Sequence, residues 1–165
     1  MRLLIIRHAI AVPHGTPDVP EDKRPLTPRG QRRFRAAARG LARICGRPDV
    51  LLTSPLVRAR QTAEIAAKAW GRIEPVDEKA LAGGSFDQVA AVLDKHKDKR
   101  VVAIVGHEPD VSSLVARLLG TTASERLTFK KGGAALLDVP RRLADGGALI
   151  WYASPRLLRA AAGEE

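Results

Sequence analysis

Short aliphatic runs of strand length alternate along this chain with longer segments of helical periodicity. The runs occupy residues 3–6, 50–53, 101–105, 134–139 and 148–152, with a weaker candidate at 73–76. Apolar residues at helical spacing occupy residues 27–45, 55–70, 85–95 and 111–118 between them. This alternation is typical of a layered α/β fold, in which helices cover a mostly parallel sheet.

Proline positions set the boundaries of several elements. Thr27-Pro28 and Ser54-Pro55 each combine a capping side chain with a proline suited to a first helical turn, so both pairs predict a helix start. Residues 13–26 contain four prolines among charged residues and are predicted to form a surface loop without a regular element.

The length of the chain limits its domain organisation. With 165 residues there is room for one core, and no linker or internal repeat interrupts the pattern. We expect a single domain over residues 1–158 and a C-terminal tail over 159–165, with the acidic end Gly163–Glu165 frayed.

The lengths of the apolar runs and the cysteine content indicate the cellular compartment. A membrane span needs roughly 20 apolar residues, and Arg7 and His8 interrupt the first aliphatic run before it could serve as a signal-peptide core. The single Cys45 cannot form an internal disulfide. We therefore expect a cytoplasmic protein without a membrane partner.

The chain is strongly basic, with 28 Lys and Arg against 18 Asp and Glu and a formal net charge of +10. This charge favours anionic partners. The arginines between Arg29 and Arg39 keep a basic nucleic-acid-binding module open as an alternative. Aromatic residues are only 4% of the chain and no nucleic-acid motif is present, so nucleic acid is the disfavoured partner. No pattern indicates an oligomeric state.

Polar residues follow three of the predicted strands. The first strand ends at Arg7-His8, the second is followed by Ser54 and by Arg58 one helical turn later, and the third ends at Gly106-His107. In an open α/β sheet, ligands bind beyond the carboxyl ends of the strands. We expect these two histidines and two arginines to meet at one edge of the sheet.

Several chemistries lack their usual sequence elements. The four histidines show no ligand spacing and no accompanying cysteines, so no metal is expected. A P-loop and a Gly-x-Ser-x-Gly elbow are also absent. Histidine is a competent nucleophile for phosphorus, and arginines match phosphate geometry. The set therefore favours phosphoryl transfer to histidine.

The same segments resemble the histidine phosphatase (phosphoglycerate-mutase-like) superfamily. Leu4-Ile5-Ile6-Arg7-His8-Ala9 is similar to its Arg-His-Gly signature, with alanine where glycine is commoner. Residues 52–63 resemble its second signature, Val105-Gly106-His107 its third, and Leu26–Gly30 its helix entry. The order and spacing, and the segment Trp151–Pro155, resemble the small SixA-type phosphohistidine phosphatases.

This resemblance implies a three-layer α/β sandwich and assigns roles to the motif residues. His8 would be phosphorylated during turnover, and Arg7, Arg58 and His107 would form the phosphate pocket, without metal or cofactor. Arg24, in the preceding loop, is a further candidate for substrate binding.

The carboxylate that serves many relatives as a general acid has no secure match. Glu78 and Glu108 are possible acids. General acid catalysis contributes about 10²–10⁴-fold, and a phosphoramidate needs it less than an ester does. We therefore expect a phosphatase acting on protein phosphohistidine. The alternative is a phosphatase for small phosphomonoesters or phosphoanhydrides.

Overall fold

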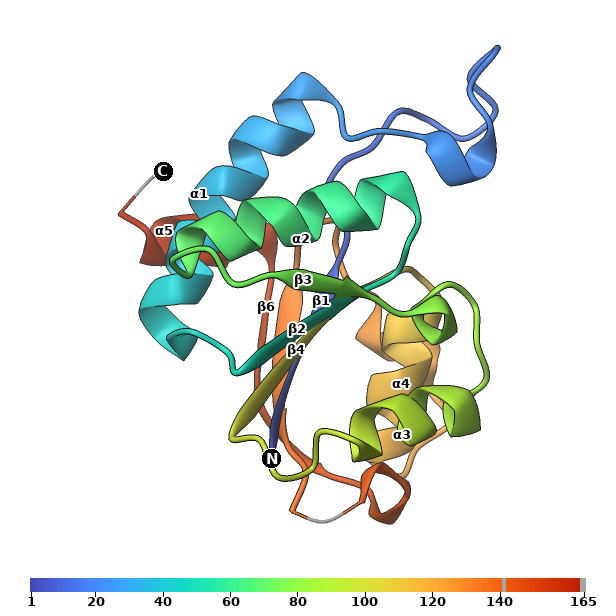
Figure 1. Ribbon diagram of the computed structural model, residues 1–165, viewed down its shortest axis with the longest axis vertical. Coiled ribbons are helices and arrows are strands. Elements are labelled where there is room, and N and C mark those ends of the chain that lie inside the picture. Colours follow the sequence, from blue (N-terminus) through green and yellow to red (C-terminus); the bar gives the residue numbers. More distant parts are fainter. Residues whose placement is uncertain (141, 164–165) are drawn as a thin grey trace.

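The computed structural model describes residues 1–140 and 142–163, which form a six-stranded sheet between two layers of helices (Figure 1). The strands are β1 (Arg2–Arg7), β2 (Val50–Thr53), β3 (Pro75–Asp77), β4 (Val101–Gly106), β5 (Ala134–Asp138) and β6 (Ala148–Ala153). The α-helices are α1 (Pro28–Cys45), α2 (Val57–Ala69), α3 (Phe86–Asp94), α4 (Asp110–Leu118) and α5 (Pro155–Ala161). The short 3₁₀ turns are η1 (Glu21–Lys23), η2 (Lys79–Leu81), η3 (Ser124–Leu127) and η4 (Leu143–Asp145).

The sheet has the strand order β3-β2-β4-β1-β5-β6. Strands β3, β2, β4 and β1 are parallel, and β5 pairs antiparallel with both β1 and β6. The expected α/β fold with a mostly parallel sheet is confirmed. Because β4 lies between β1 and β2, the three strands that carry the candidate site are direct neighbours.

Alternate residues of the central strands face two separate cores. Leu4 and Ile6 of β1 join the core beneath α1, α2 and α5, whereas Leu3 and Ile5 join the core beneath α3 and α4. All four side chains are fully buried. This period of two places one layer of helices on each face of the sheet, as Figure 1 shows.

Two predicted helix starts had different outcomes. Thr27 caps α1, since its side chain accepts from the Gly30 amide, and Pro28 occupies the first turn. The start predicted at Ser54-Pro55 is wrong, because α2 begins at Val57 and has no side-chain cap. The Ser54 hydroxyl instead contacts His107.

Other differences concern short elements. The loop over residues 13–26 contains η1, so our expectation of no regular element there is wrong for Glu21–Lys23. Helix α5 was not predicted; Ser154 caps it, and residue 158, where we placed the domain boundary, lies inside it. Glu164 and Glu165 of the expected frayed end lie outside the described residues.

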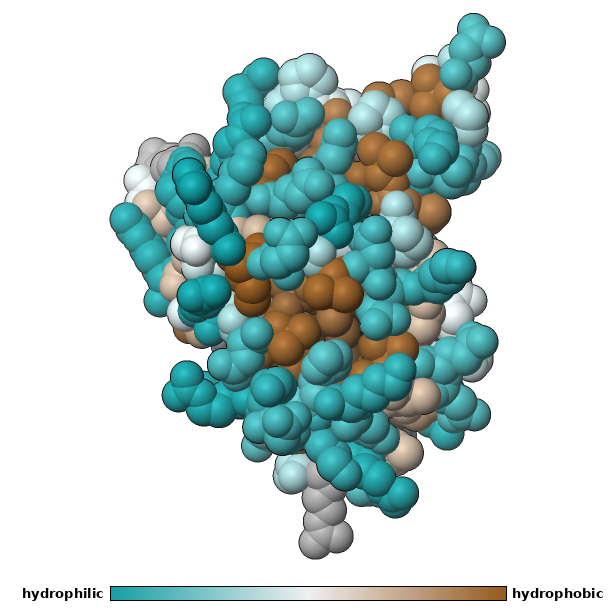
Figure 2. All heavy atoms as spheres, in the orientation of Figure 1, coloured by the Kyte–Doolittle hydropathy of each residue, from teal (hydrophilic) through white to brown (hydrophobic). Residues whose placement is uncertain are grey.

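The surface that carries β3 is mostly hydrophilic, with a hydrophobic area at its centre (Figure 2). Val76 of this edge strand is 48% exposed. Among the residues that the structure describes, no helix combines the length and apolar character needed to cross a membrane.

Candidate functional site

The register of the parallel strands brings the three polar strand ends together. Arg7 of β1 is paired with Gly106 of β4, and the His8 amide extends this ladder by donating to the Gly106 carbonyl at 3.0 Å. The Ser54 amide donates to Val105 in the same way from the other side of β4. The rings of His8 and His107 consequently lie 5.1 Å apart between centroids.

His8 is held as a neutral ring with a defined tautomer. Its Nδ1 lies 2.7 Å from the Ala9 carbonyl oxygen, which only accepts, so Nδ1 carries the proton and Nε2 keeps its lone pair. Burial lowers the pKa of His8 to about 3, and the charges of Arg58 and Arg7 act in the same direction. At neutral pH this imidazole is an uncharged nucleophile.

Thr62 fixes the backbone around His8, a role that sequence reasoning missed. Its hydroxyl accepts from the Ala9 amide at 3.0 Å and donates to the Arg58 carbonyl at 2.7 Å. Thr62 is fully buried on the inner face of α2, one turn after Arg58. The signal available in the sequence was a hydroxyl side chain four residues after Arg58, on the apolar face of the predicted helix.

Arg58 is buried and held along its outer edge by η1. Its Nη1 donates to the Glu21 carbonyl at 2.8 Å, and its Nη2 lies 3.3 Å from the Glu21 carboxylate. The Nε of Arg58 is buried and has no hydrogen-bond partner among the described residues.

Arg24, the further substrate-binding candidate, is engaged with the protein. Its Nε and Nη2 donate to the two Glu21 carboxylate oxygens at 2.8 and 2.6 Å, and its Nη1 donates to the Val12 carbonyl. Hydrogen bonds from Arg24, and then from His14, lower the pKa of Glu21 to about 2. The carboxylate of Glu21 therefore stands between Arg24 and Arg58.

Arg7 is held from the opposite side of the site. Its Nη1 donates to the Phe129 carbonyl, and its Nε is buried without a partner among the described residues. Burial lowers the pKa of Arg7, and the nearby Glu108 carboxylate acts against that shift. The Phe129 segment is itself fixed, because the Tyr152 hydroxyl donates to the Thr128 carbonyl at 2.7 Å.

Glu108, a predicted possible acid, lies beneath Arg7. One carboxylate oxygen accepts from the Phe129 amide at 2.6 Å, and the other accepts from the Ser112 hydroxyl. One oxygen thus holds Phe129, whose carbonyl accepts from Arg7, and the other is bonded to Ser112 of α4. The structure gives Glu108 a supporting position near the arginine.

Glu78, the other possible acid, follows β3 at the same end of the sheet. Its amide donates to the Thr53 carbonyl at 2.8 Å, next to Ser54. Its carboxylate has no hydrogen bond or ion pair with any other described residue. Glu78 lines a separate hollow of about 500 Å³ that also contains Lys79 and Gln88.

His107 presents one ring nitrogen to the site. Its Nε2 lies 2.7 Å from the Ser54 hydroxyl, and its Nδ1 is buried without a partner among the described residues. Burial lowers the pKa of His107 to about 4, and the charges of Arg58 and Arg24 reinforce the shift. A neutral ring that accepts from Ser54 at Nε2 carries its proton at Nδ1.

Three buried side-chain nitrogens of this site therefore have no hydrogen-bond partner among the described residues. Over residues 1–140 and 142–163, buried side-chain nitrogens without a hydrogen bond occur at Arg7 Nε, Arg58 Nε, His107 Nδ1 and Trp70 Nε1. Buried polar groups are normally paired, so an unpaired group calls for an explanation. The first three belong to residues that lie close to His8, and a phosphoryl group, with charge spread over three oxygens, would satisfy them.

No described group of three or more His, Cys, Asp or Glu side chains converges in a way that could hold a metal ion. The positive charges of the site come from arginines, which offer forked donors to an anion. The arrangement can therefore bind a phosphoryl group and present a neutral histidine nitrogen to it.

Known proteins share this fold and these sequence features. The profile of the histidine phosphatase superfamily (branch 1) matches residues 3–90. An uncharacterised protein of Picosynechococcus sp. is 36% identical over 138 residues, which cover 81% of this chain and 82% of the relative. A structure of the protein histidine phosphatase SixA complexed with tungstate is 26% identical, with a TM-score of 0.81 over 96% of this chain and 99% of the other.

A more distant structure shares the fold alone. The α-ribazole phosphatase from Shigella flexneri is 20% identical and has a TM-score of 0.71, covering 94% of this chain and 97% of the other. Together these similarities confirm the expected fold class and the resemblance drawn from the sequence.

The two neutral histidines predict an acid-sensitive fold. Burial lowers the pKa of His8 to about 3 and that of His107 to about 4, against 6.5 in an unfolded chain. At a pH between the folded and unfolded pKa values, the unfolded chain binds more protons than the folded chain. The contribution of the two histidines to the unfolding free energy is therefore fully present above pH 6.5 and decreases as the pH falls. Each histidine contributes a slope of up to about 1.4 kcal/mol per pH unit.

Urea unfolding of the protein and of two variants between pH 7 and pH 5 tests this linkage. We expect the slope of the unfolding free energy to decrease in His8→Gln and to decrease again in His8→Gln/His107→Gln. An unchanged slope in the double variant would contradict the assignment of neutral rings.

Proposed function

Because the chain belongs to the histidine phosphatase superfamily and is a phosphatase, we propose that it hydrolyses phosphohistidine on proteins through a phosphoryl group carried by His8. The observation that carries this proposal is the arrangement around His8 Nε2. The His8 ring lies 5.1 Å from that of His107, and the charges of Arg58 and Arg7 act on it; each of these three residues has a buried nitrogen without a partner among the described residues. The similarity to a protein histidine phosphatase complexed with tungstate supports the substrate class.

In the first step, the His8 Nε2 lone pair attacks phosphorus. A new N–P bond forms, and the bond from phosphorus to the substrate imidazole breaks with its electron pair going to that ring. The leaving imidazole is neutral when its second nitrogen carries a proton. Arg7, Arg58 and the His107 Nδ1–H stabilise the charge on the equatorial oxygens.

In the second step, water attacks the phosphoryl group on His8. The N–P bond breaks, its electrons return to His8 Nε2, and inorganic phosphate leaves with the proton released to solvent. Dividing one displacement into two in this way is the benefit of a covalent intermediate. The hydrogen bond from Nδ1–H to the Ala9 carbonyl keeps the ring oriented through both steps.

The positions of the carboxylates support a leaving group that needs little acid catalysis. Both oxygens of Glu108 accept hydrogen bonds from protein donors, and Glu78 lines a different hollow. A phosphoramidate is the substrate that such a site serves best. A single Cys45, which cannot form an internal disulfide, supports a reducing compartment such as the cytoplasm.

A second candidate function is hydrolysis of small phosphomonoesters or phosphoanhydrides. The position of Glu78 favours this function. Its amide donates to the Thr53 carbonyl, and the next residue, Ser54, is hydrogen-bonded to His107. If the Glu78 side chain rotates toward the pocket, its carboxyl group in the protonated form would donate that proton to an alkoxide leaving group.

Phosphate release from two substrates tests the proposal. One is a peptide carrying a single phosphohistidine, and the other is O-phosphoserine, an alkyl phosphate ester whose alkoxide leaving group has to be protonated. We expect kcat/KM for the peptide to be higher by at least about 10²-fold, because the ester lacks the acid that it needs. His8→Ala should reduce both activities by at least about 10³-fold through loss of the nucleophile.

Equal or faster turnover of the ester would contradict the phosphohistidine preference. Peptide hydrolysis that persists in His8→Ala would contradict the proposed intermediate.

Variants at the two carboxylates separate an acid from a positioning residue. Glu108→Ala should lower kcat/KM for the peptide about 10-fold, since Arg7 loses its anchored partner, and misplacement of a binding group is costly. Glu108→Gln should restore most of the activity, because its amide oxygen still accepts from Phe129. Glu78→Gln should stay within about twofold of the wild type on the phosphohistidine peptide.

A general acid would give a different pattern. Glutamine would then be as damaging as alanine, and the ester would be affected more than the phosphoramidate.

A further inference from the structure

A groove adjoins the candidate site on the face covered by α1 and α5. It has a volume of about 520 Å³ and lies between α1, the start of α5 and the segment preceding β5. Besides Arg7 of the candidate site, five basic residues line it, namely Arg33, Lys130, Lys131, Arg156 and Arg159. Among the described residues, no acidic side chain lines this groove.

The cations of the groove lack carboxylate partners. Over residues 1–140 and 142–163, none of the five forms an ion pair, and Arg159 donates only to the Pro155 carbonyl. Burial, followed by the proximity of Arg33 and Arg156, lowers the pKa of Arg159. Like charges are thus gathered at a concave surface, where an anion would relieve their repulsion.

The groove is continuous with the backbone of the candidate site. Arg7 and Ala9, on either side of His8, also line it. The Gly132 amide donates to the carbonyls of both Arg7 and His8, at 3.2 and 3.0 Å. A ligand in the groove would therefore lie next to the chain that carries His8.

The floor of the groove is apolar. Ile10, Phe34 and Pro155 contribute to it, and Gly132 allows close packing, since an added Cβ would lie 3.1 Å from the Phe34 ring. A chain of phosphates alone would leave this floor uncovered. A polypeptide with both acidic and apolar side chains matches the rim and the floor together.

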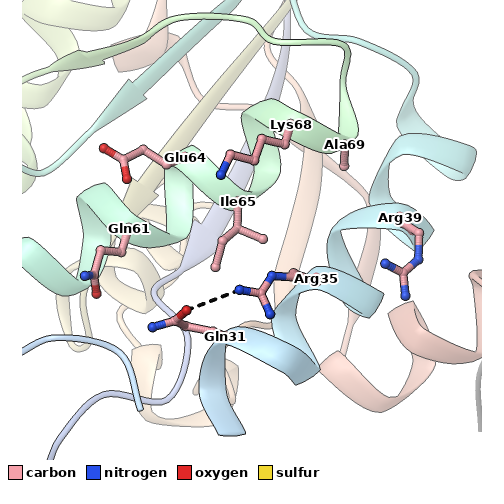
Figure 3. A pocket seen from close by; sticks show the side chains of 8 residues that line it. All are labelled: Gln31, Arg35, Arg39, Gln61, Glu64, Ile65, Lys68 and Ala69. Atoms are coloured by element: carbon pink, nitrogen blue, oxygen red, sulfur yellow. Dashed lines mark hydrogen bonds between the residues drawn. The ribbon is translucent and has the colours of Figure 1, made fainter. Parts of the chain in front are cut away.

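The hollow between α1 and α2 differs in its charge pattern (Figure 3). It has a similar volume of about 460 Å³, but the acidic Glu64 lines it together with its basic residues, which are Arg35, Arg39 and Lys68. Arg35 also donates to Gln31 of the same helix at 3.3 Å. Reversing two cations of this hollow, Arg35 of α1 and Lys68 of α2, gives a matched control with the same change in net charge.

We propose that the groove binds an acidic segment of the protein substrate and so directs its phosphohistidine to His8. This inference rests on the proposed function for the identity of the substrate. The acidic side chains pair with the five cations, and neighbouring apolar side chains cover the floor. The groove thereby selects among phosphorylated proteins, while the pocket at His8 recognises only the phosphoryl group.

The test compares two double variants that change the net charge equally. Arg33→Glu/Arg156→Glu reverses two cations of the groove, and Arg35→Glu/Lys68→Glu reverses two cations of the control hollow. The substrates are a phosphohistidine peptide flanked by glutamate and leucine, the same peptide with glutamine for glutamate, and free phosphohistidine.

We expect the groove variant to raise KM for the glutamate peptide at least 10-fold, with kcat within twofold. Its activity on the glutamine peptide and on free phosphohistidine should match the wild type. The control variant should keep KM for the glutamate peptide within twofold of the wild-type value. Equal KM values for the two peptides in the wild type, or equal effects of the two variants, would overturn the proposal.

A binding measurement distinguishes failure of the groove from failure of the proposed function. Fluorescence anisotropy with His8→Ala and the unphosphorylated glutamate peptide requires no turnover. We expect binding that weakens at least 10-fold when Arg33→Glu/Arg156→Glu is added and that weakens with salt. A single-stranded oligonucleotide that binds the groove more tightly than the peptide would overturn the assignment to a protein segment.

Discussion

The parallel pairing of β4 with β1 on one side and β2 on the other is the constraint on which the site depends. Each of these strands ends in the residues that carry the chemistry, and their register aligns the ends within hydrogen-bonding distance. The amides of His8 and Ser54 extend the ladders to the same strand. If the pairing register of one strand shifted by one residue, each of its core and site side chains would turn to the opposite face of the sheet.

The electrostatics of the site follow from this convergence. Two arginines and two histidines share a buried space, and the electrostatic free energy of burying them is lowest when both imidazoles are neutral. Neutral His8 is the nucleophilic form, and His107 has a buried Nδ1 without a partner among the described residues. Other residues hold the arginines in place. Glu21 contacts Arg58, and Glu108 accepts from the amide of Phe129, whose carbonyl accepts from Arg7.

Local patterns predicted much of the fold. The aliphatic runs identified the strands, and the Thr27 cap identified α1, because these features depend on periodicity and on nearby hydrogen bonds. The convergence of Arg7, His8, Arg58 and His107 followed from strand ends in a parallel sheet. The role of Ser54 was missed because its hydroxyl bonds His107, which is 53 positions away in the sequence.

Long-range partners account for the other differences. Arg24 was predicted to bind substrate; the structure adds that Glu21 and Val12 contact its guanidinium group, which spacing along the loop does not reveal. Glu108 was considered as an acid, yet its oxygens are directed to Phe129 and Ser112. The basic groove likewise combines α1, α5 and the segment before β5, which only the folded chain brings together.

The central claim is that His8 carries the phosphoryl group during turnover. The direct measurement is an alkaline, denaturing quench of the enzyme within milliseconds of mixing with a ³²P-phosphohistidine peptide, followed by digestion and fragment sequencing. The tryptic peptide that begins at His8 also contains His14, so His14→Gln is measured in parallel. The account predicts acid-labile label on His8 in both proteins; label on another residue, or rapid turnover without label on the enzyme, would contradict it.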